Sequence, residues 1–259
     1  MHIINLLYSI SGFSVGMLVG MTGVGGGALM TPLLILLFGI HPAIAVGSDL
    51  LYAAITKTGG SLIHGISGTI EWRVVGRLAC GSVPMTAVTL FLLSKLNLTG
   101  STASGLITVV LSGTLFFTAA VLILRQKIVA HFATRAAQLE PCQTAVLTIL
   151  AGAVLGVLVS ISSVGAGAIG VSALLLLHPR LPTASIVGTD IAHAVPLTLI
   201  AGIGHGILGS TDWALIGSLL IGSLPGIVIG SYLSTRVPDM VLRLAVAVAL
   251  FVVGGKLVL

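Results

Sequence analysis

GMLVGMTGVGGGALMTP, residues 16–32, is the stretch that decides the fold of this chain. It lies within apolar sequence, yet it contains six glycines, three of them consecutive at Gly25, Gly26 and Gly27. Glycine disfavours a helix by about 1 kcal/mol relative to alanine, so an unbroken helix through this stretch is not expected. A bilayer tolerates broken backbone only where protein buries it or water reaches it. The stretch therefore predicts a helix that is broken inside a membrane.

The composition of the whole chain points to the same environment. Of 259 residues, 56% are hydrophobic and 7% are charged, and the mean hydropathy is +1.22. A soluble domain carries about 25% charged residues, so this chain is predicted to be an all-α, polytopic integral membrane protein. The net charge of +5 does not indicate a nucleic-acid partner, because the basic residues are scattered rather than gathered in one stripe.

Apolar segments follow one another along the chain, separated by glycine, proline or charged residues. They cover roughly residues 3–22, 28–40, 43–64, 73–95, 101–124, 143–162, 166–178, 183–205, 213–233 and 240–258. A spanning helix needs about 20 apolar residues. The segments 28–40 and 166–178 are too short, so they are predicted to be half-helices or tilted broken segments, which leaves eight to ten helices. The polar residues 125–141 are expected to link a first membrane repeat, 1–124, to a second, 142–259.

The two halves of the chain are copies of each other. The stretch GMLVGMTGVGGGA, from Gly16, matches GVLVSISSVGAGA, from Gly156, with Gly25 paired to Gly165 and Gly27 to Gly167. The second copy then gains one residue, and further matches follow in the shifted register. They pair Gly47-Ser48-Asp49 with Gly188-Thr189-Asp190, His64 with His205, Trp72 with Trp213, and Gly81-Ser82-Val83-Pro84 with Gly222-Ser223-Leu224-Pro225.

The basic residues predict how the chain is oriented. If every segment reverses the chain direction, eight lysines and arginines fall on one side, and only Lys95 and Lys256 fall on the other. By the positive-inside rule, the linker 125–141 is then cytoplasmic and both termini are periplasmic. The two halves start on opposite sides, so they are predicted to be inverted repeats of about five segments each. Inverted repeats with broken helices are typical of secondary transporters, whose site lies at the membrane midplane.

The motif GVGGGALMTPLL, the downstream AVGSDL and the weaker second copy resemble the TauE/SafE family of sulfite exporter-like membrane transporters. The resemblance covers essentially the whole chain. It implies export of small sulfur-containing anions such as sulfite, sulfoacetate or other organosulfonates across a bacterial inner membrane. The second copy departs from the motif, because Ala166 replaces a glycine and Ser172 stands where the first copy has Pro32.

A helix that begins after each glycine break would point its first backbone N–H groups and its positive dipole end inward, which favours an anion. The candidate substrate-binding residues are the break glycines and nearby hydroxyls, namely Gly25, Gly26, Gly27, Thr22, Thr31, Ser162, Ser163, Gly165 and Gly167. The alternative role for glycine in a membrane is close helix packing. That role is expected for Gly12, Gly16, Gly20, Gly152 and Gly156.

A few polar residues lie inside the apolar segments, and they are candidates for coupling or for lining the pathway: Asp49, Lys57, Asp190, His64 and His205. Intramembrane carboxylates are costly and are functional by default, although Asp49 and Asp190 could instead cap the helices that follow them. A lysine within an apolar segment must pair, snorkel or bind an anion. The histidines lie near segment ends, where a structural role is the alternative.

No catalytic, nucleotide-binding or metal-binding motif is found in the sequence, so no enzyme activity, cofactor or metal is predicted. The expected partners are a small anionic substrate, the lipid bilayer and a proton or ion gradient, and the oligomeric state stays open. Two alternatives to an anion transporter remain. One is a proton-coupled cation or metal carrier that uses the aspartates and histidines. The other is an intramembrane enzyme, which the repetition of the polar residues in both halves disfavours.

Overall fold

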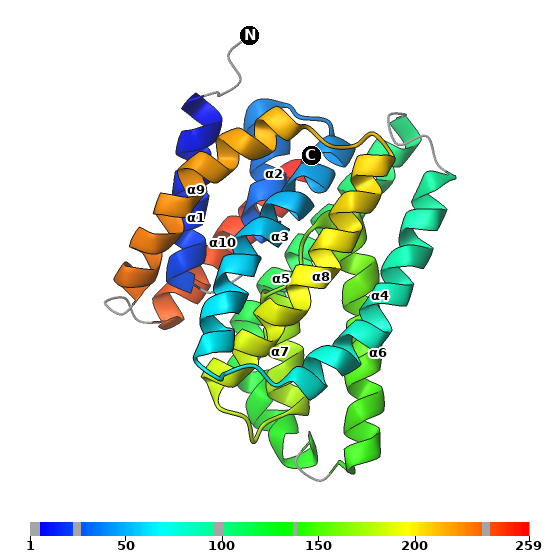
Figure 1. Cartoon of the computed structure of the whole chain (residues 1–259), viewed down its shortest axis with the longest axis vertical. Helices are drawn as coiled ribbons and strands as arrows, with labels where there is room; N and C mark the ends of the chain where they lie inside the picture. The colour runs from blue at the N-terminus through cyan, green and yellow to red at the C-terminus, as the bar shows by residue number, and fades with distance from the viewer. Residues whose placement is uncertain (1–5, 23–26, 96–100, 137–138, 235–238, 259) are drawn as a thin grey trace.

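The computed structural model describes residues 6–22, 27–95, 101–136, 139–234 and 239–258, which form ten helices and no strand (Figure 1). The helices are α1 (Leu6–Thr22), α2 (Gly27–Phe38), α3 (Pro42–Ile66), α4 (Trp72–Ser94), α5 (Ser101–Ala136), α6 (Pro141–Ser162), α7 (Ala168–Leu177), α8 (Thr183–Ile207), α9 (Trp213–Ser234) and α10 (Asp239–Val258). Within these ranges, five helices are long and apolar enough to cross a membrane. The prediction of an all-helical, polytopic membrane protein is confirmed.

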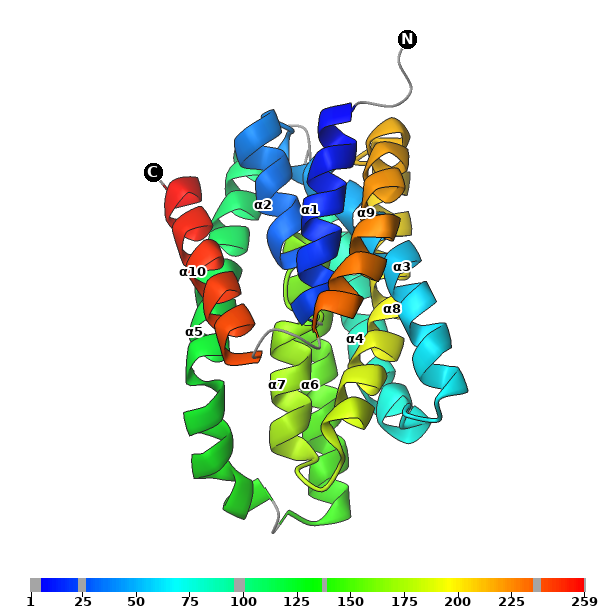
Figure 2. The same ribbon diagram turned by 90° about the vertical axis from the view of Figure 1, so that its left-hand side faces the viewer.

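The two short segments are half-helices, as predicted. α2 has 12 residues and α7 has 10, so they are about 18 and 15 Å long at 1.5 Å per residue. That is about half of the hydrocarbon thickness of a bilayer. α1 and α2 form a hairpin that enters from one end of the bundle, and α6 and α7 form a hairpin that enters from the other end (Figure 2). The α6–α7 turn and the start of α2 therefore lie towards the middle of the molecule.

Local sequence explains where several helices begin and end. α3 and α6 start with proline at their first positions, Pro42 and Pro141, where the missing N–H costs nothing. Glu140 caps α6 in a capping box with Gln143. α5 differs from the expectation, because it runs on to Ala136 through residues that were expected to be linker. Lysine, arginine, alanine and glutamine are good helix formers, so the loss of hydropathy after residue 124 ends the apolar segment but not the helix.

The halves pack against each other through matching contacts. α1 lies along α9, and α4 lies along α6 (Figures 1 and 2). Gly12 of α1 meets the backbone of Leu219 in α9, while Gly152 of α6 meets the backbone of Leu78 in α4. Two further contacts repeat this exchange, Gly16 with Ser223 and Gly156 with Ser82. The packing role expected for these four glycines is confirmed, whereas the surroundings of Gly20 are not described.

Hydrogen bonds between the halves repeat in the same way. The hydroxyl of Ser48 accepts the backbone N–H of Asp212 at 3.0 Å, and the hydroxyl of Thr189 accepts the backbone N–H of Glu71 at 3.0 Å. In the alignment of the two halves, Ser48 pairs with Thr189 and Glu71 pairs with Asp212. The copied sequences therefore make copied contacts with each other, as two halves related by a two-fold axis would. Their inversion across a membrane stays a prediction.

Successive helices alternate in direction between the two ends of the bundle (Figure 1). α1 begins and α10 ends at one end, while α5 leads into α6 at the other (Figures 1 and 2). The starts of α4 and α9 lie at opposite ends (Figure 1). Their first residues, Trp72 and Trp213, are 65% and 71% exposed, as expected for tryptophans at a membrane interface. Which end faces the cytoplasm stays a prediction from the charge bias.

Candidate functional site

The second glycine break has a backbone that only glycine adopts easily. Between α6 and α7, Gly165 has φ +112° and Gly167 has φ +132°, and Ser163 adopts the left-handed conformation at φ 59°. L-residues with a side chain rarely adopt positive φ, so both glycines are required at this break. Ser162 supports the turn, because its hydroxyl accepts the backbone N–H of Val164 at 3.2 Å.

Three N–H groups at the start of α7 donate to carbonyls of the break itself. The N–H groups of Ile169 and Gly170 both donate to the carbonyl of Gly165 at 3.2 Å, and Val171 donates to Gly167 at 2.9 Å. An anion could bind these three N–H groups only by displacing the carbonyls of Gly165 and Gly167. The use of this break as an anion site stays a prediction.

A buried cation occupies the break instead. The ammonium of Lys57, on α3, donates to the carbonyl of Ala166 at 2.8 Å. Lys57 is 9% exposed and lies within electrostatic reach of both Asp49 and Asp190. The predicted pathway lysine therefore connects the first half to the break of the second half. Because a buried ammonium needs partners, the carbonyl of Ala166 holds it and the two carboxylates nearby compensate its charge.

Asp49 is held by partners from two other elements. One carboxylate oxygen accepts the hydroxyl of Thr31, on α2, at 2.5 Å, and Ser163 of the break lies beside the carboxylate without a hydrogen bond of standard geometry. The capping alternative is wrong for this residue, because α3 begins at Pro42 and Asp49 is well inside the helix. Asp49 and Thr31 instead bring α2, α3 and the second break together.

Asp190 has a different environment, although it occupies the equivalent position in α8. It is 1% exposed, its Oδ1 has no hydrogen-bond partner, and it accepts no hydrogen bond from the described residues. The carboxylate lies against Gly170 of α7, where any Cβ would clash with it. Capping is again wrong, because α8 begins at Thr183. Asp190 is therefore a buried carboxylate whose compensating charge, among the described residues, is Lys57.

The two histidines lie outside this cluster and support the packing of the halves. The Nδ1 of His64 meets the hydroxyl of Thr69 at 2.8 Å, and the Nε2 of His205 donates to the carbonyl of Ser160 at 2.9 Å. His64 lies against Gly188, and His205 lies against Gly47. These contacts favour the structural role over a role in the pathway.

Several candidates lie at the first break. Gly27 begins α2 and Thr22 ends α1, but the side chain of Thr22 is not described. Gly25 and Gly26 lie outside the described residues. The predicted use of these residues as an anion site stays a prediction.

Sequence reasoning missed two polar contacts one helical turn from the aspartates. His193, on the turn after Asp190, has its Nε2 2.8 Å from the hydroxyl of Ser82 on α4. Tyr52, on the turn after Asp49, lies beside Ser223 on α9. The repeat itself carries the signal, because aligning the halves pairs His193 with Tyr52 and Ser82 with Ser223.

Broken half-helices that meet in the interior, with a buried lysine and two buried aspartates at the turn, are features of a polytopic membrane transporter. Comparison with known proteins agrees. Residues 8–257 match the model of the family described as sulfite exporter TauE/SafE. The chain belongs to this family. The family and the names of its relatives indicate a membrane transporter rather than an enzyme.

Curated relatives carry the same kind of name. A "Probable membrane transporter protein YjnA" of Bacillus subtilis (strain 168) is 40% identical over 248 residues, covering 95% of this chain and 97% of that protein. A "Probable membrane transporter protein YdhB" of the same organism is 29% identical, covering 90% of this chain and 92% of that protein. A "Probable membrane transporter protein" of Xylella fastidiosa (strain 9a5c) is 28% identical, covering 79% and 75%. No solved structure shows significant similarity to this chain.

Proposed function

We propose that this chain is a secondary carrier that exports small sulfur-containing anions, such as sulfite or organosulfonates, by alternating access at a site between its two halves. The observation that carries the proposal is Lys57, a buried ammonium held on the carbonyl of Ala166 at a helix break. It is the only lysine or arginine buried among the residues whose exposure is described. An anion that reaches the break has this one positive charge to bind.

The proposed binding step is an exchange of partners at Lys57. In the structure the ammonium is satisfied by a carbonyl, which is a neutral and replaceable acceptor. An oxoanion is a stronger partner, since hydrogen bonds between two charged groups are about twice as strong as neutral ones. When the anion leaves, the carbonyl of Ala166 takes the ammonium back. Loaded and empty states then both have a satisfied lysine, which suits a carrier that must release its cargo.

Asp190 is the proposed coupling group. Its unpartnered oxygen and its position beside Lys57 mean that an incoming anion changes the charge that it experiences. A carboxylate that gains a proton when a monovalent anion binds would leave the net charge of Asp49, Lys57 and Asp190 unchanged. The carrier would then move an anion together with a proton, so its net flux would depend on the pH on both sides of the membrane.

A proton-coupled cation carrier is the second candidate, because two carboxylates and a carbonyl surround the break. The ammonium of Lys57 already lies on the carbonyl of Ala166, where a bound cation would lie, so a metal or alkali ion would have to displace it. The two candidates separate in one assay. Purified protein in proteoliposomes should exchange ³⁵S-sulfite across the membrane, and Lys57→Met should stop the exchange. Flux of Na⁺, K⁺ or a divalent cation without any flux of sulfite or sulfonates would overturn the anion proposal.

A further inference from the structure

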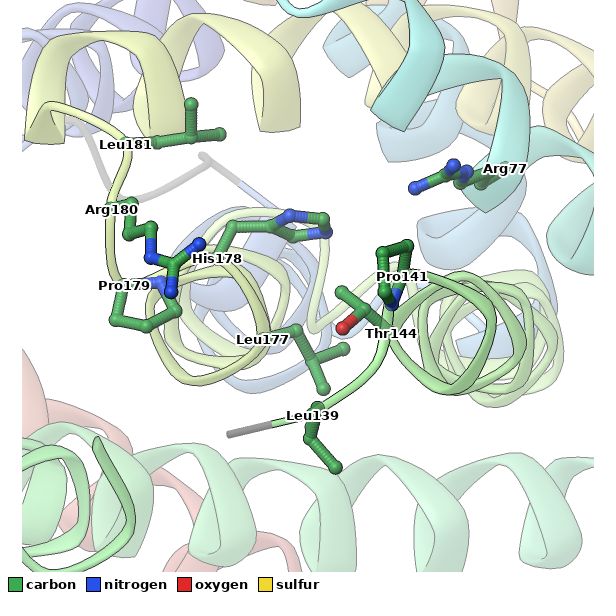
Figure 3. A pocket seen from close by; sticks show the side chains of 9 residues that line it. All are labelled: Arg77, Leu139, Pro141, Thr144, Leu177, His178, Pro179, Arg180 and Leu181. Atoms are coloured by element: carbon green, nitrogen blue, oxygen red, sulfur yellow. The ribbon is translucent and has the colours of Figure 1, made fainter. Parts of the chain in front are cut away.

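A cavity of about 240 Å³ lies at the end of the bundle where the start of α4, the start of α6 and the α7–α8 connection meet (Figure 3). Asp49, Lys57 and Asp190 are not among the residues that line it. Its polar lining consists of Arg77, Thr144, His178 and Arg180, and the rest is apolar or proline. The volume is large enough for a small oxoanion with several water molecules, since one water takes about 30 Å³ of the liquid.

Three of the four polar lining residues, Arg77, His178 and Arg180, are cationic or can become cationic. Arg77 enters from α4 and Arg180 from the α7–α8 connection, and the ring of His178 lies between them (Figure 3). No carboxylate is among the lining residues. Guanidinium groups are planar, multiple hydrogen-bond donors that match the oxygens of an oxoanion, and two of them approach this cavity from different elements.

The hydrogen bonds of Thr148 determine which ring nitrogen of neutral His178 carries the hydrogen. The hydroxyl of Thr148 donates its one hydrogen to the carbonyl of Thr144 at 2.6 Å. It can therefore only accept from the ring, so the contact of 3.1 Å assigns the hydrogen of neutral His178 to Nε2. The Nδ1 of His178 then carries a lone pair. Protonation converts Nδ1 into an N–H donor and adds a positive charge to the cavity.

Burial and charged neighbours set the pH at which His178 is protonated. Burial lowers the pKa of His178, Arg77 lowers it further, and Glu71 at the start of α4 opposes the shift. Glu140, which precedes the lining residue Pro141, uses its side chain to cap α6. His178 is therefore neutral near pH 7 in the empty cavity and gains its proton as the pH falls or as an anion enters.

The residues of the first half that match the lining of this cavity are not cationic. In the alignment of the glycine breaks, Tyr8 and Phe38 are the counterparts of Thr148 and His178, and their rings pack edge to face with centroids 4.7 Å apart. In the shifted register beyond the breaks, Ser218 and Gly39 stand in place of Arg77 and Arg180. The four matching positions of the first half therefore do not repeat the cationic residues of this cavity.

We propose that the Arg77–His178–Arg180 cavity is a second anion site, which collects small oxoanions at one mouth of the carrier before they reach the break. This inference rests on the proposed function for the cargo, but binding at the cavity can be measured without transport. Because the site lies at one end of the bundle and its cationic residues are not repeated at the matching positions, it favours loading from that end. The charge bias assigns that end to the cytoplasm, which matches export.

The test uses the full-length protein in nanodiscs and ³⁵S-sulfate as the probe, since sulfate keeps its charge between pH 6 and 8. Equilibrium dialysis of Lys57→Met/Asp190→Asn, which removes the buried lysine together with its carboxylate partner, measures binding at the cavity without the break. We expect sulfate to bind this variant, and Arg77→Gln together with Arg180→Gln to weaken binding at least tenfold, since each removes a charged hydrogen bond. Arg77→Lys with Arg180→Lys keeps both charges and should restore most of the affinity.

Two matched variants sharpen the result. Arg73→Gln removes an exposed arginine one turn away on the same helix and should change the affinity less than twofold. In the Lys57→Met/Asp190→Asn background, sulfate binding should strengthen as the pH falls from 8 to 6, and adding His178→Phe, which copies Phe38 of the other half, should abolish that dependence. Sulfate binding that is equal in the Arg77→Gln/Arg180→Gln and Arg73→Gln variants would overturn the proposal.

Transport separates this inference from the proposed function. In proteoliposomes, Arg77→Gln/Arg180→Gln should raise the KM for sulfite offered at the cavity end and leave the KM at the other end unchanged. An equal change at both ends would contradict a site at one mouth. If sulfite is not transported but sulfate binding still depends on both arginines, the proposed cargo is wrong and the cavity site stands.

Discussion

Asp49 and Asp190 occupy equivalent positions in the two halves, yet their hydrogen-bond partners differ. Asp49 accepts a hydrogen bond from Thr31, whereas Asp190 accepts none from the described residues. The helices that face them explain the difference. When the halves are aligned through their glycine breaks, Val171 of α7 stands where α2 has Thr31, and Gly170 stands where α2 has Met30. The second half has thus lost the donor and gained space beside its carboxylate.

On this difference we base different proposed roles for the two halves. The first half supplies a fixed carboxylate and the lysine, and the second half supplies the break and a carboxylate without a fixed partner. In the proposed mechanism, Asp49 holds the structure and Asp190 is the group that changes its charge.

Lys57→Met should have the largest effect, because both aspartates depend on this ammonium. Removing one partner from a buried charged cluster costs roughly 3–5 kcal/mol, and sulfite exchange should be lost. Thermal unfolding in detergent measures the first effect and sulfite counterflow the second. Adding Asp190→Asn should recover stability without recovering transport. The exposed Lys95, replaced by methionine, is the control, and an equal loss there would remove the special role of Lys57.

Gly170→Ala should be next, because its Cβ would clash with the Asp190 carboxylate. Overpacking of this kind costs about 1–3 kcal/mol, and the carboxylate would have to move away from Lys57. Gly113→Ala in α5 is the matched control, because no atom lies within 4 Å of its added Cβ. That variant should be neutral or more stable. Equal stability of the two variants would mean that Asp190 does not need this space.

Thr31→Val should destabilise the protein by roughly 1–2 kcal/mol, because it leaves the Asp49 carboxylate without its donor. The side chains are nearly equal in volume, so packing is preserved. Transport per folded molecule should change little, since Asp49 is assigned a structural role. A large loss of transport with unchanged stability would reverse the roles of the two aspartates.

Val171→Thr should give the smallest change in stability and makes the second half like the first. The new hydroxyl could donate to Asp190, which would add about 1 kcal/mol of stability. A carboxylate held in this way should respond less to pH, so the pH dependence of sulfite transport should become weaker. Unchanged pH dependence would show that the missing donor does not matter for coupling.

Much of the fold follows from the sequence, because the repeat and the glycine breaks are local patterns. They predict the half-helices and the glycines that pack α1 on α9 and α4 on α6. The end of α5 was not predicted, because Arg125 and Lys127 end a hydropathic pattern while remaining good helix formers. The aspartates were ambiguous because Gly-Ser-Asp resembles a cap, although Pro42 already marks an earlier start for α3.

The chemistry of the site required tertiary structure. The bond between Lys57 and Ala166 joins residues 109 positions apart and uses a backbone carbonyl, which leaves no trace in residue types. The sequence predicts a helix start at the second break, but it does not show that the carbonyl of Gly165 accepts the N–H groups of Ile169 and Gly170. A helix start can be read from glycine and hydroxyl residues, whereas the direction of each carbonyl depends on φ and ψ in the turn.

The comparison is tested most directly by sulfite uptake driven by a pH gradient in proteoliposomes that contain Asp190→Asn or Asp49→Asn. A carrier that has lost its coupling carboxylate still exchanges cargo but no longer accumulates it against a gradient. Asp190→Asn should therefore keep sulfite exchange and lose gradient-driven uptake, while Asp49→Asn should keep both in the molecules that fold. If Asp190→Asn still accumulates sulfite in response to the pH gradient, Asp190 is not the coupling group and the proposed division between the halves is wrong.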